Sequence, residues 1–249
     1  GFRERMEGFL TKALREAKRY TSWVNTDEAY EAAAQSLLRA LVAPGSAFLD
    51  EFRPLARRLA FHGALTGLAR TVLKCTLPGV PDVYQGTEFW DLSLVDPDNR
   101  RPVDYAARAR ALAADEPLEA LLASWRNGRI KQRVLAALLA DRADAPSLYA
   151  EGGYEPLFAS GAAARHVVGF VRRQGADTLV VAVPRLFGGA VENESMPVGP
   201  EFWGDTTLPL PAGKWRNVDT GATAQTGSSP HPVAELFSTL PILVLRTMR

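Results

Sequence analysis

Residues 77–105 read LPGVPDVYQGTEFWDLSLVDPDNRRPVDY. An apolar helical stretch runs into this segment from about residue 61 and stops at Pro78-Gly79, a pair that commonly ends a helix. The next run, residues 80–85, is short and apolar and predicts a buried strand. Residues 86–102 carry no apolar period, so a long polar loop is expected there, and loops of this length are usually functional or disordered.

This loop crowds acids, amides and arginines among aromatic residues. Carboxylates and amides accept hydrogen bonds from sugar hydroxyls, a guanidinium donates two in a fixed fork, and an aromatic ring covers the apolar face of a pyranose. The composition therefore suits a sugar subsite. It also fits an alternative in which Asp96, Asp98, Arg100 and Arg101 pair with one another on a solvated loop.

A calcium loop is a further alternative, because Asp96-x-Asp98-Asn99 resembles the opening of such a loop. Position six, however, is Arg101 rather than Gly, and position twelve is Ala107 rather than Glu. Gly-rich phosphate loops, dinucleotide fingerprints, paired-His zinc motifs and nucleophile elbows are also missing from the sequence. We expect no metal site and no cofactor.

Helical periodicity dominates the first 152 residues. Upstream of the loop it predicts helices over residues 6–17, 30–41 (with Asn25 and Thr26 as candidate caps), 46–59 and 61–77. Downstream it predicts helices over residues 103–114, 118–125 and 130–139.

Beyond residue 152 the pattern changes to short β-rich runs separated by Gly, Pro, Asn and Asp. Residues 166–171 and 178–183 predict a hairpin, and further strands are expected around Trp215 and over residues 234–237 and 242–245. Several short strands at this spacing suggest an antiparallel β-sandwich. The expected organisation is α+β, with a helical domain over 1–152 and a sandwich domain over 153–249.

Composition and net charge indicate which classes of binding partner are expected. The 249 residues are 47% hydrophobic and 23% charged, and 29 basic against 28 acidic residues give a net charge of +1. No overall field exists to attract nucleic acid or anionic lipid, so neither is expected as a partner. The single cysteine, Cys75, lies in an apolar helical stretch, and neither a membrane span nor a signal peptide is evident, which favours the cytoplasm.

Residues 78–88, PGVPDVYQGTE, resemble the eighth barrel strand of the α-amylase superfamily. The continuation DPDNRRPVDY, residues 96–105, is similar to the form found in maltooligosyl trehalose synthases. Thr21-Ser22-Trp23, at the end of the 12–23 run, and WRNGRIK, residues 125–131, also look like that family. The resemblance covers most of the chain and implies the C-terminal part of a (β/α)8 barrel with added helices.

The resemblance also implies roles for residues of the loop. Asp96 and Arg100 match the superfamily's Asp-x-x-x-Arg pattern, which implies hydrogen bonds to a glucose unit on the donor side of the reacting bond. Gln85, Glu88 and Asn99 are further candidates for substrate contact or for support. The family's three catalytic acids would all precede Gly1, so no catalytic residue is assigned here and the chain alone is expected to be inactive.

The implied activity is that of an isomerase, (1→4)-α-D-glucan 1-α-D-glucosylmutase. It converts the reducing-end α-1,4 linkage of a maltooligosaccharide to an α,α-1,1 linkage by intramolecular transfer, in trehalose biosynthesis. The expected partners are the maltooligosaccharide or α-1,4-glucan and the remainder of the barrel. Two alternatives stay open: an α-glucan hydrolase of the same superfamily, and a non-catalytic glucan-binding module.

The five tryptophans have different expected roles. Trp23 and Trp90 lie in or near the matched motifs, and each is a candidate either for stacking on sugar or for anchoring the fold. Trp125, Trp203 and Trp215 are assigned to packing.

Overall fold

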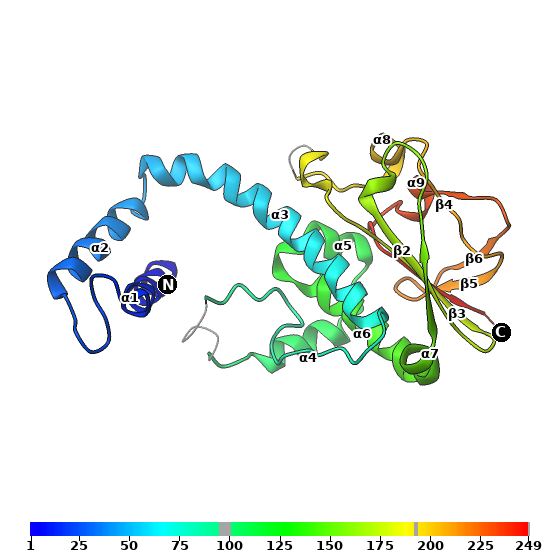
Figure 1. The fold of residues 1–249 in the computed structure, drawn as a ribbon, viewed down its shortest axis with the longest axis horizontal. Coiled ribbons are helices and arrows are strands. Elements are labelled where there is room, and N and C mark those ends of the chain that lie inside the picture. The colour runs from blue at the N-terminus through cyan, green and yellow to red at the C-terminus, as the bar shows by residue number, and fades with distance from the viewer. Residues whose placement is uncertain (95–100, 192–193, 249) are drawn as a thin grey trace. The chain divides into compact units, whose positions relative to one another are not determined.

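The computed structural model describes residues 1–94, 101–191 and 194–248 (Figure 1). The chain divides into two compact units. The first unit contains residues 1–59 and 91–103, and the second contains residues 60–90 and 104–249. None of the helices within the described ranges is long and apolar enough to cross a membrane.

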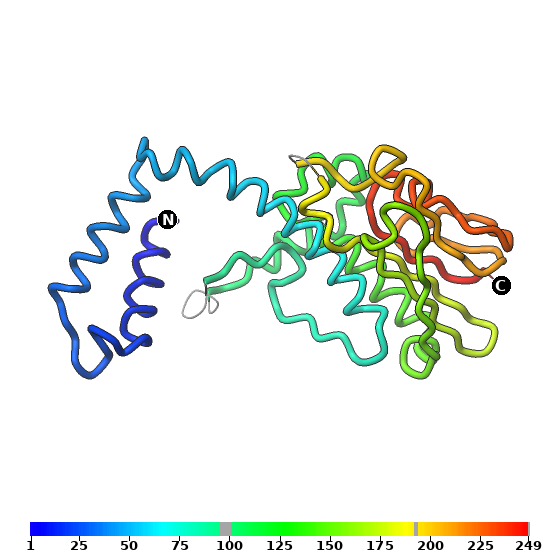
Figure 2. The backbone as a smooth tube through the Cα atoms, turned by 45° about the horizontal axis from the view of Figure 1, so that its top comes forward, coloured from blue at the N-terminus to red at the C-terminus, as the bar shows by residue number. Residues whose placement is uncertain are grey.

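Two antiparallel helices, α1 (Phe2–Ala17) and α2 (Glu28–Leu41), pack side by side in the first unit (Figure 1, Figure 2). The Gln35 amide joins them by donating to the Glu7 carbonyl oxygen at 2.9 Å and to the Thr11 hydroxyl at 2.7 Å. Both helices were predicted. The cap of α2 was not, because the Asp27 carboxylate, rather than Asn25 or Thr26, accepts the Tyr30 N–H at 2.9 Å.

Residues 46–77 were predicted as two helices, and the structure has one, α3 (Ala47–Thr76), with Pro54 inside it. The sequence around the predicted break, Leu59-Ala60-Phe61, contains neither Gly nor Pro, so nothing local interrupts the helical hydrogen bonds. The prediction of two separate helices was wrong.

Residues 80–85 form no strand, contrary to the prediction. Val80 is 94% exposed and Tyr84 is 61% exposed, and the chain then turns, with the Thr87 N–H donating to the Tyr84 carbonyl oxygen at 3.0 Å. A strand requires a neighbouring strand for its backbone hydrogen bonds. The sheet pairings among the described residues place no strand beside this segment.

Four helices and a short 3-10 helix follow in the second unit. They are α4 (Tyr105–Ala113), α5 (Leu118–Ala123), η2 (Trp125–Asn127), α6 (Arg129–Asp144) and α7 (Pro146–Glu151). The three helices predicted for this region are confirmed, with α6 longer than expected. The short helix α7 was not predicted; it has Pro146 in its first turn, where the missing N–H leaves no helical hydrogen bond unmade.

A six-stranded antiparallel sheet dominates the rest of the second unit, in the order β1-β2-β3-β8-β5-β6. Its strands are β1 (Gly153–Leu157), β2 (Val167–Gln174), β3 (Asp177–Pro184), β5 (Gly213–Asn217), β6 (Thr223–Thr226) and β8 (Leu243–Thr247). The predicted β2–β3 hairpin is confirmed, with Gln174 paired to Asp177 across a turn that contains Gly175. An α+β fold with an antiparallel sheet is therefore confirmed.

The region after β3 contains smaller elements. A two-stranded sheet pairs β4 (Thr207–Leu208) with β7 (His231–Pro232), and two short helices are α8 (Gly199–Trp203) and α9 (Val233–Leu236). The strand predicted over residues 234–237 is wrong, because this segment lies in and just after α9. Val233 and Phe237 are both buried, and a spacing of four residues places them on one face of a helical turn.

The sheet buries both of its faces because its strands are apolar at consecutive positions. One face packs on α3, α6 and α7, and contributes Phe170, Leu179, Val181, Val183 and Val244 to that core. The other face packs on α8, α9 and the β4–β7 pair, and contributes Val171, Val180, Ala182, Leu243 and Leu245. The alternation along β2, β3 and β8 fixes which side chain faces which layer.

Candidate functional site

Two of the predicted site residues, Gln85 and Glu88, lie on the segment between α3 and Trp90. The Gln85 amide oxygen accepts a hydrogen bond from the Tyr105 hydroxyl at 3.0 Å. The Glu88 carboxylate is 2.9 Å from the Arg108 Nε, and these two side chains are 26% and 17% exposed. Both residues therefore bind side chains of α4.

Arg108 organises this segment. Its guanidinium donates to the Gly86 carbonyl oxygen and, at 3.1 Å, to the Asp104 carbonyl oxygen, in addition to the pair with Glu88. It also lies over the Phe89 ring, 4.7 Å from the ring centroid. A guanidinium offers five donors in a rigid fork, so one side chain contacts the backbone at Gly86 and the side chains of Glu88 and Phe89.

The 125–131 run also holds this segment. The Lys131 ammonium donates to the carbonyl oxygens of Thr87 at 2.6 Å and Phe89 at 3.1 Å. The Trp90 indole N–H donates to the Trp125 carbonyl oxygen at 2.6 Å. The matched stretches 78–88 and 125–131 are thus in direct contact, through Thr87 and Lys131.

Gly128 makes this contact possible. A Cβ at Gly128 would lie 2.6 Å from the Trp90 backbone nitrogen and 2.9 Å from the Phe89 Cβ. Its φ of +79° is also in the region that favours glycine. Glycine is therefore required sterically at position 128 of the WRNGRIK run, which the sequence alone did not indicate.

The remaining predicted site residues, Asp96, Asn99 and Arg100, lie outside the described residues, and their roles stay predictions. Arg108 and Lys131 are functional candidates that the sequence did not predict. Lys131 lies in a run that had been matched to the family, which was a usable indication. Nothing in the sequence distinguishes Arg108 from Arg110, the other arginine of α4.

The structure separates the two tryptophans whose roles were open. Trp90 packs against the core and donates its N–H to the backbone, so it anchors the 86–90 segment. Trp23, in the first unit, is 55% exposed. Trp203 and Trp215 are 0% and 1% exposed, which confirms their assignment to packing.

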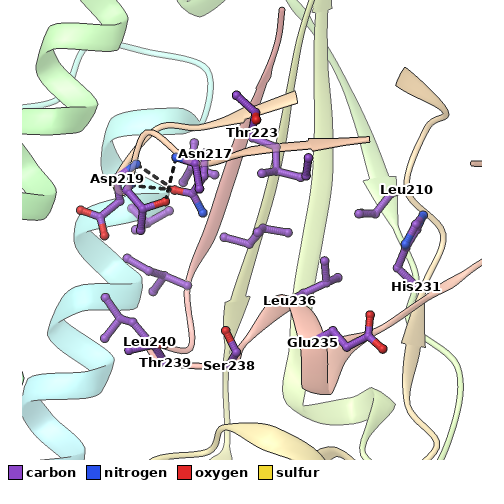
Figure 3. A pocket seen from close by; sticks show the side chains of 18 of the residues that line it. Leu210, Asn217, Asp219, Thr223, His231, Glu235, Leu236, Ser238, Thr239 and Leu240 are labelled. Carbon is purple, nitrogen blue, oxygen red and sulfur yellow. Dashed lines mark hydrogen bonds between the residues drawn. The ribbon is translucent and has the colours of Figure 1, made fainter. Parts of the chain in front are cut away.

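A cavity of about 420 Å³ lies elsewhere in the second unit, beside the β5–β6 turn and α9 (Figure 3). In that turn the Asn217 side-chain oxygen accepts the backbone N–H groups of Asp219 at 2.9 Å and Thr220 at 3.1 Å. Burial raises the pKa of Asp219, while the nearby Arg133 opposes this shift. Among the described residues no Trp, Tyr or Phe lines the cavity, so it lacks a stacking surface for a sugar ring.

The charged residues of the described ranges do not gather into a metal site. These ranges contain no group of three or more His, Cys, Asp or Glu side chains placed to hold a metal ion.

The whole chain was compared with known proteins and solved structures. No protein-family model matches the chain. Two curated Mycobacterium tuberculosis proteins, from strains CDC 1551 and H37Rv, carry the name maltooligosyl trehalose synthase and are 42% identical over 98% of the chain. The chain matches one segment of the maltooligosyl trehalose synthases.

Solved structures agree with the match. Maltooligosyltrehalose synthase from Arthrobacter ramosus is 37% identical, with a TM-score of 0.77 over 98% of this chain and 30% of its own. A hypothetical maltooligosyl trehalose synthase from Sulfolobus tokodaii is 27% identical, with a TM-score of 0.70 over 99% of this chain and 29% of its own. The family resemblance inferred from residues 78–105 is confirmed. The chain spans 28% of the length of the curated relatives it matches.

Proposed function

We propose that this chain forms the C-terminal part of a maltooligosyl trehalose synthase. The observation that carries the proposal is the 42% identity with proteins of that name over 98% of the chain. The contact between the matched 125–131 run and the end of the matched 78–88 stretch, with the adjoining residues 89–90, supports it, because this packing depends on Gly128 and Lys131. The proposed activity is an intramolecular transglucosylation in trehalose biosynthesis, in the cytoplasm.

In the intact enzyme the reaction exchanges one bond for another. The last α-1,4 bond at the reducing end of a maltooligosaccharide is cleaved through a glycosyl-enzyme, and the released glucose attacks this intermediate with its anomeric hydroxyl. The product carries an α,α-1,1 linkage and has the same number of atoms as the substrate. Retaining chemistry of this kind requires two carboxyl groups about 5–5.5 Å apart, which we assign to the remainder of the enzyme, so this chain alone is inactive.

Within the chain we assign glucan binding to the 85–100 segment. Asp96 and Arg100 hydrogen-bond a glucose unit on the donor side of the reacting bond, and Asn99 assists them. Gln85 and Glu88 support the segment, because their polar atoms already bind Tyr105 and Arg108. The substrate is a neutral maltooligosaccharide or α-1,4-glucan, consistent with a net charge of +1.

The domain boundary is part of the proposal. Residues 1–152 complete the catalytic barrel and add helices to it, and residues 153–249 form a β-sandwich domain. The start of β1 at Gly153, directly after α7, supports this boundary. The burial of the sheet on α6 and α7 supports a role for the β-domain in covering one side of the helical part.

The decisive experiment uses the intact enzyme that contains this chain, incubated with maltopentaose. We expect reducing ends to disappear without release of glucose or maltose, as a trehalose end forms. Arg100→Lys removes the bidentate fork and should lower kcat/KM at least about tenfold, the equivalent of about 1.4 kcal/mol. Arg53→Lys, at a 53% exposed arginine paired with Asp50, is the matched control and should change nothing. Release of glucose and maltose as the main products would refute the proposal.

A further inference from the structure

The connection between α1 and α2 exposes aromatic residues that the proposed glucan site does not use. Trp23 is 55% exposed and Tyr20 is 69% exposed, on a turn of the first unit. Most proteins keep tryptophan well buried, and this chain does so with Trp203 and Trp215. The exposure of the Trp23 indole is therefore unlike that of Trp203 and Trp215.

Trp23 is held in place despite its exposure. Its indole N–H donates to the Glu16 carboxylate at 3.0 Å, and the Arg15 guanidinium lies over its ring at 5.0 Å from the centroid. The ring is thus fixed at its polar edge and on one face. Since one face is covered by Arg15, the exposed area belongs largely to the opposite face and the outer edge of the ring.

Arg15, which covers one face of Trp23, is itself fixed. Arg15 donates to the Glu31 carboxylate through Nε and Nη2, both at 2.8 Å, and the Thr21 hydroxyl donates to the same carboxylate at 2.6 Å. Thr21 is 3% exposed and Glu31 is 9% exposed. The Thr21 hydroxyl also accepts the Asp27 N–H at 3.1 Å. This network connects α1, the turn and α2.

The three residues of the Thr21-Ser22-Trp23 motif thus have different structural roles. Thr21 points inward to the Glu31–Arg15 pair, and Ser22 shapes the turn by accepting the Asn25 N–H at 2.9 Å. Trp23 points outward on this rigid base. A pre-oriented aromatic ring loses little conformational entropy on binding, which is the property a recognition platform requires.

We propose that Trp23 forms a second contact for the α-1,4-glucan, by stacking on the apolar face of a glucose unit. This inference rests on the proposed function for the identity of the ligand. The charge of Arg15 is matched by the bidentate contact with Glu31, so a neutral ligand suits the ring better than an anion. Exposed polar side chains of the same turn, such as Asn25, offer hydrogen-bonding groups for sugar hydroxyls.

Affinity electrophoresis of the 249-residue protein through gels containing maltodextrin tests the platform. We expect the wild-type protein to be retarded and Trp23→Ala to weaken the apparent affinity at least tenfold. Trp23→Phe keeps an aromatic face and should retain part of the retardation. Phe158→Ala is the matched control, because Phe158 is 77% exposed in the other unit and should not contribute.

The outcomes are distinct. Unretarded wild-type protein, or equal retardation of Trp23→Ala, overturns the platform, provided that circular dichroism shows the variant to be folded. The maltopentaose assay of the intact enzyme is read separately. If that enzyme forms trehalose ends while Trp23→Ala binds normally, only the platform fails. If the enzyme hydrolyses maltopentaose while Trp23→Ala loses binding, the platform stands and the synthase assignment fails.

Discussion

The Arg172 guanidinium donates a hydrogen bond of 2.9 Å to the carbonyl oxygen of Thr76, which ends α3. Arg172 is on β2 and is 0% exposed. Its other donors reach the carbonyl oxygens of Tyr149, Gly152 and Gly153 at 2.7–3.2 Å. A cation in the sheet thus satisfies the carbonyl groups at the C-terminal ends of two helices, where the helix dipole favours positive charge.

Arg172→Met should destabilise the second unit by about 3 kcal/mol or more, because it leaves several buried carbonyl oxygens without a donor. Urea denaturation measures this loss. Arg173→Met is the control at the next residue, where the side chain is 48% exposed and lies 3.7 Å from Glu155. That change should cost less than about 0.5 kcal/mol. Equal costs at the two positions would contradict the assigned role of Arg172.

A second buried contact joins α6 to α7 and the sheet. The Tyr149 hydroxyl donates to the Asp141 carboxylate at 2.8 Å, and the same carboxylate accepts from Arg216 at 2.7 Å and Arg246 at 3.2 Å. Burial raises the pKa of Tyr149, and the negative charge of Asp141 raises it further.

Tyr149→Phe should cost about 1.5 kcal/mol, the value of one hydrogen bond to a charged group. Tyr154→Phe, at a 50% exposed tyrosine, is the control. Because the folded pKa lies above the unfolded value of about 10, Tyr149 contributes stability below pH 10 that is lost as the pH rises further. Absorbance at alkaline pH should show Tyr149 ionising only on unfolding. Its titration in the native protein would disprove this.

The sequence predicts best those elements whose apolar pattern and turn residues lie within the element itself. The β2–β3 hairpin combines two apolar runs with a polar turn around Gly175, so its pairing is set locally. Residues 80–85 have a similar apolar run, but a strand there depends on a distant neighbour to accept its hydrogen bonds. The sequence cannot show whether that neighbour is present, and the prediction failed.

The same limit applies to the site. Gln85 and Glu88 were identified by residue type and resemblance, which does not reveal that Tyr105 and Arg108 occupy their polar atoms. The importance of Gly128 likewise depends on the approach of Trp90, 38 positions earlier in the chain. Contacts of this kind follow from the fold rather than from any local pattern.

Gly128→Ala should destabilise the second unit more than a positive φ alone explains. The added Cβ would lie 2.6 Å from the Trp90 backbone nitrogen, so the 89–90 segment must move. Gly175→Ala is the matched control, because its φ is +58° but a Cβ there meets nothing within 4 Å. The control should cost about 1–2 kcal/mol. Hydrogen exchange should quicken at residues 86–90 only in Gly128→Ala, and equal behaviour of the two variants would refute the steric argument.

The Glu31 carboxylate gives the first unit a defined response to acid. Hydrogen bonds from Arg15 and then Thr21 lower its pKa from 4.5 to about 2. Because the folded pKa is below the unfolded value, the stabilisation is complete above pH 4.5 and is lost as the pH falls towards 2. Glu31→Gln removes the charge at every pH.

Hydrogen exchange of α1 and α2 in wild-type protein and Glu31→Gln should therefore differ at pH 7 and converge near pH 2. Glu51→Gln, at an exposed position of α3, serves as the control and should match the wild type throughout. Protonation of Glu31 also affects the support of Trp23, since Arg15, which lies over the Trp23 ring, then loses its charged partner. A difference between wild type and Glu31→Gln that stays constant from pH 7 to pH 2 would show that the Arg15–Glu31 pair does not stabilise this unit.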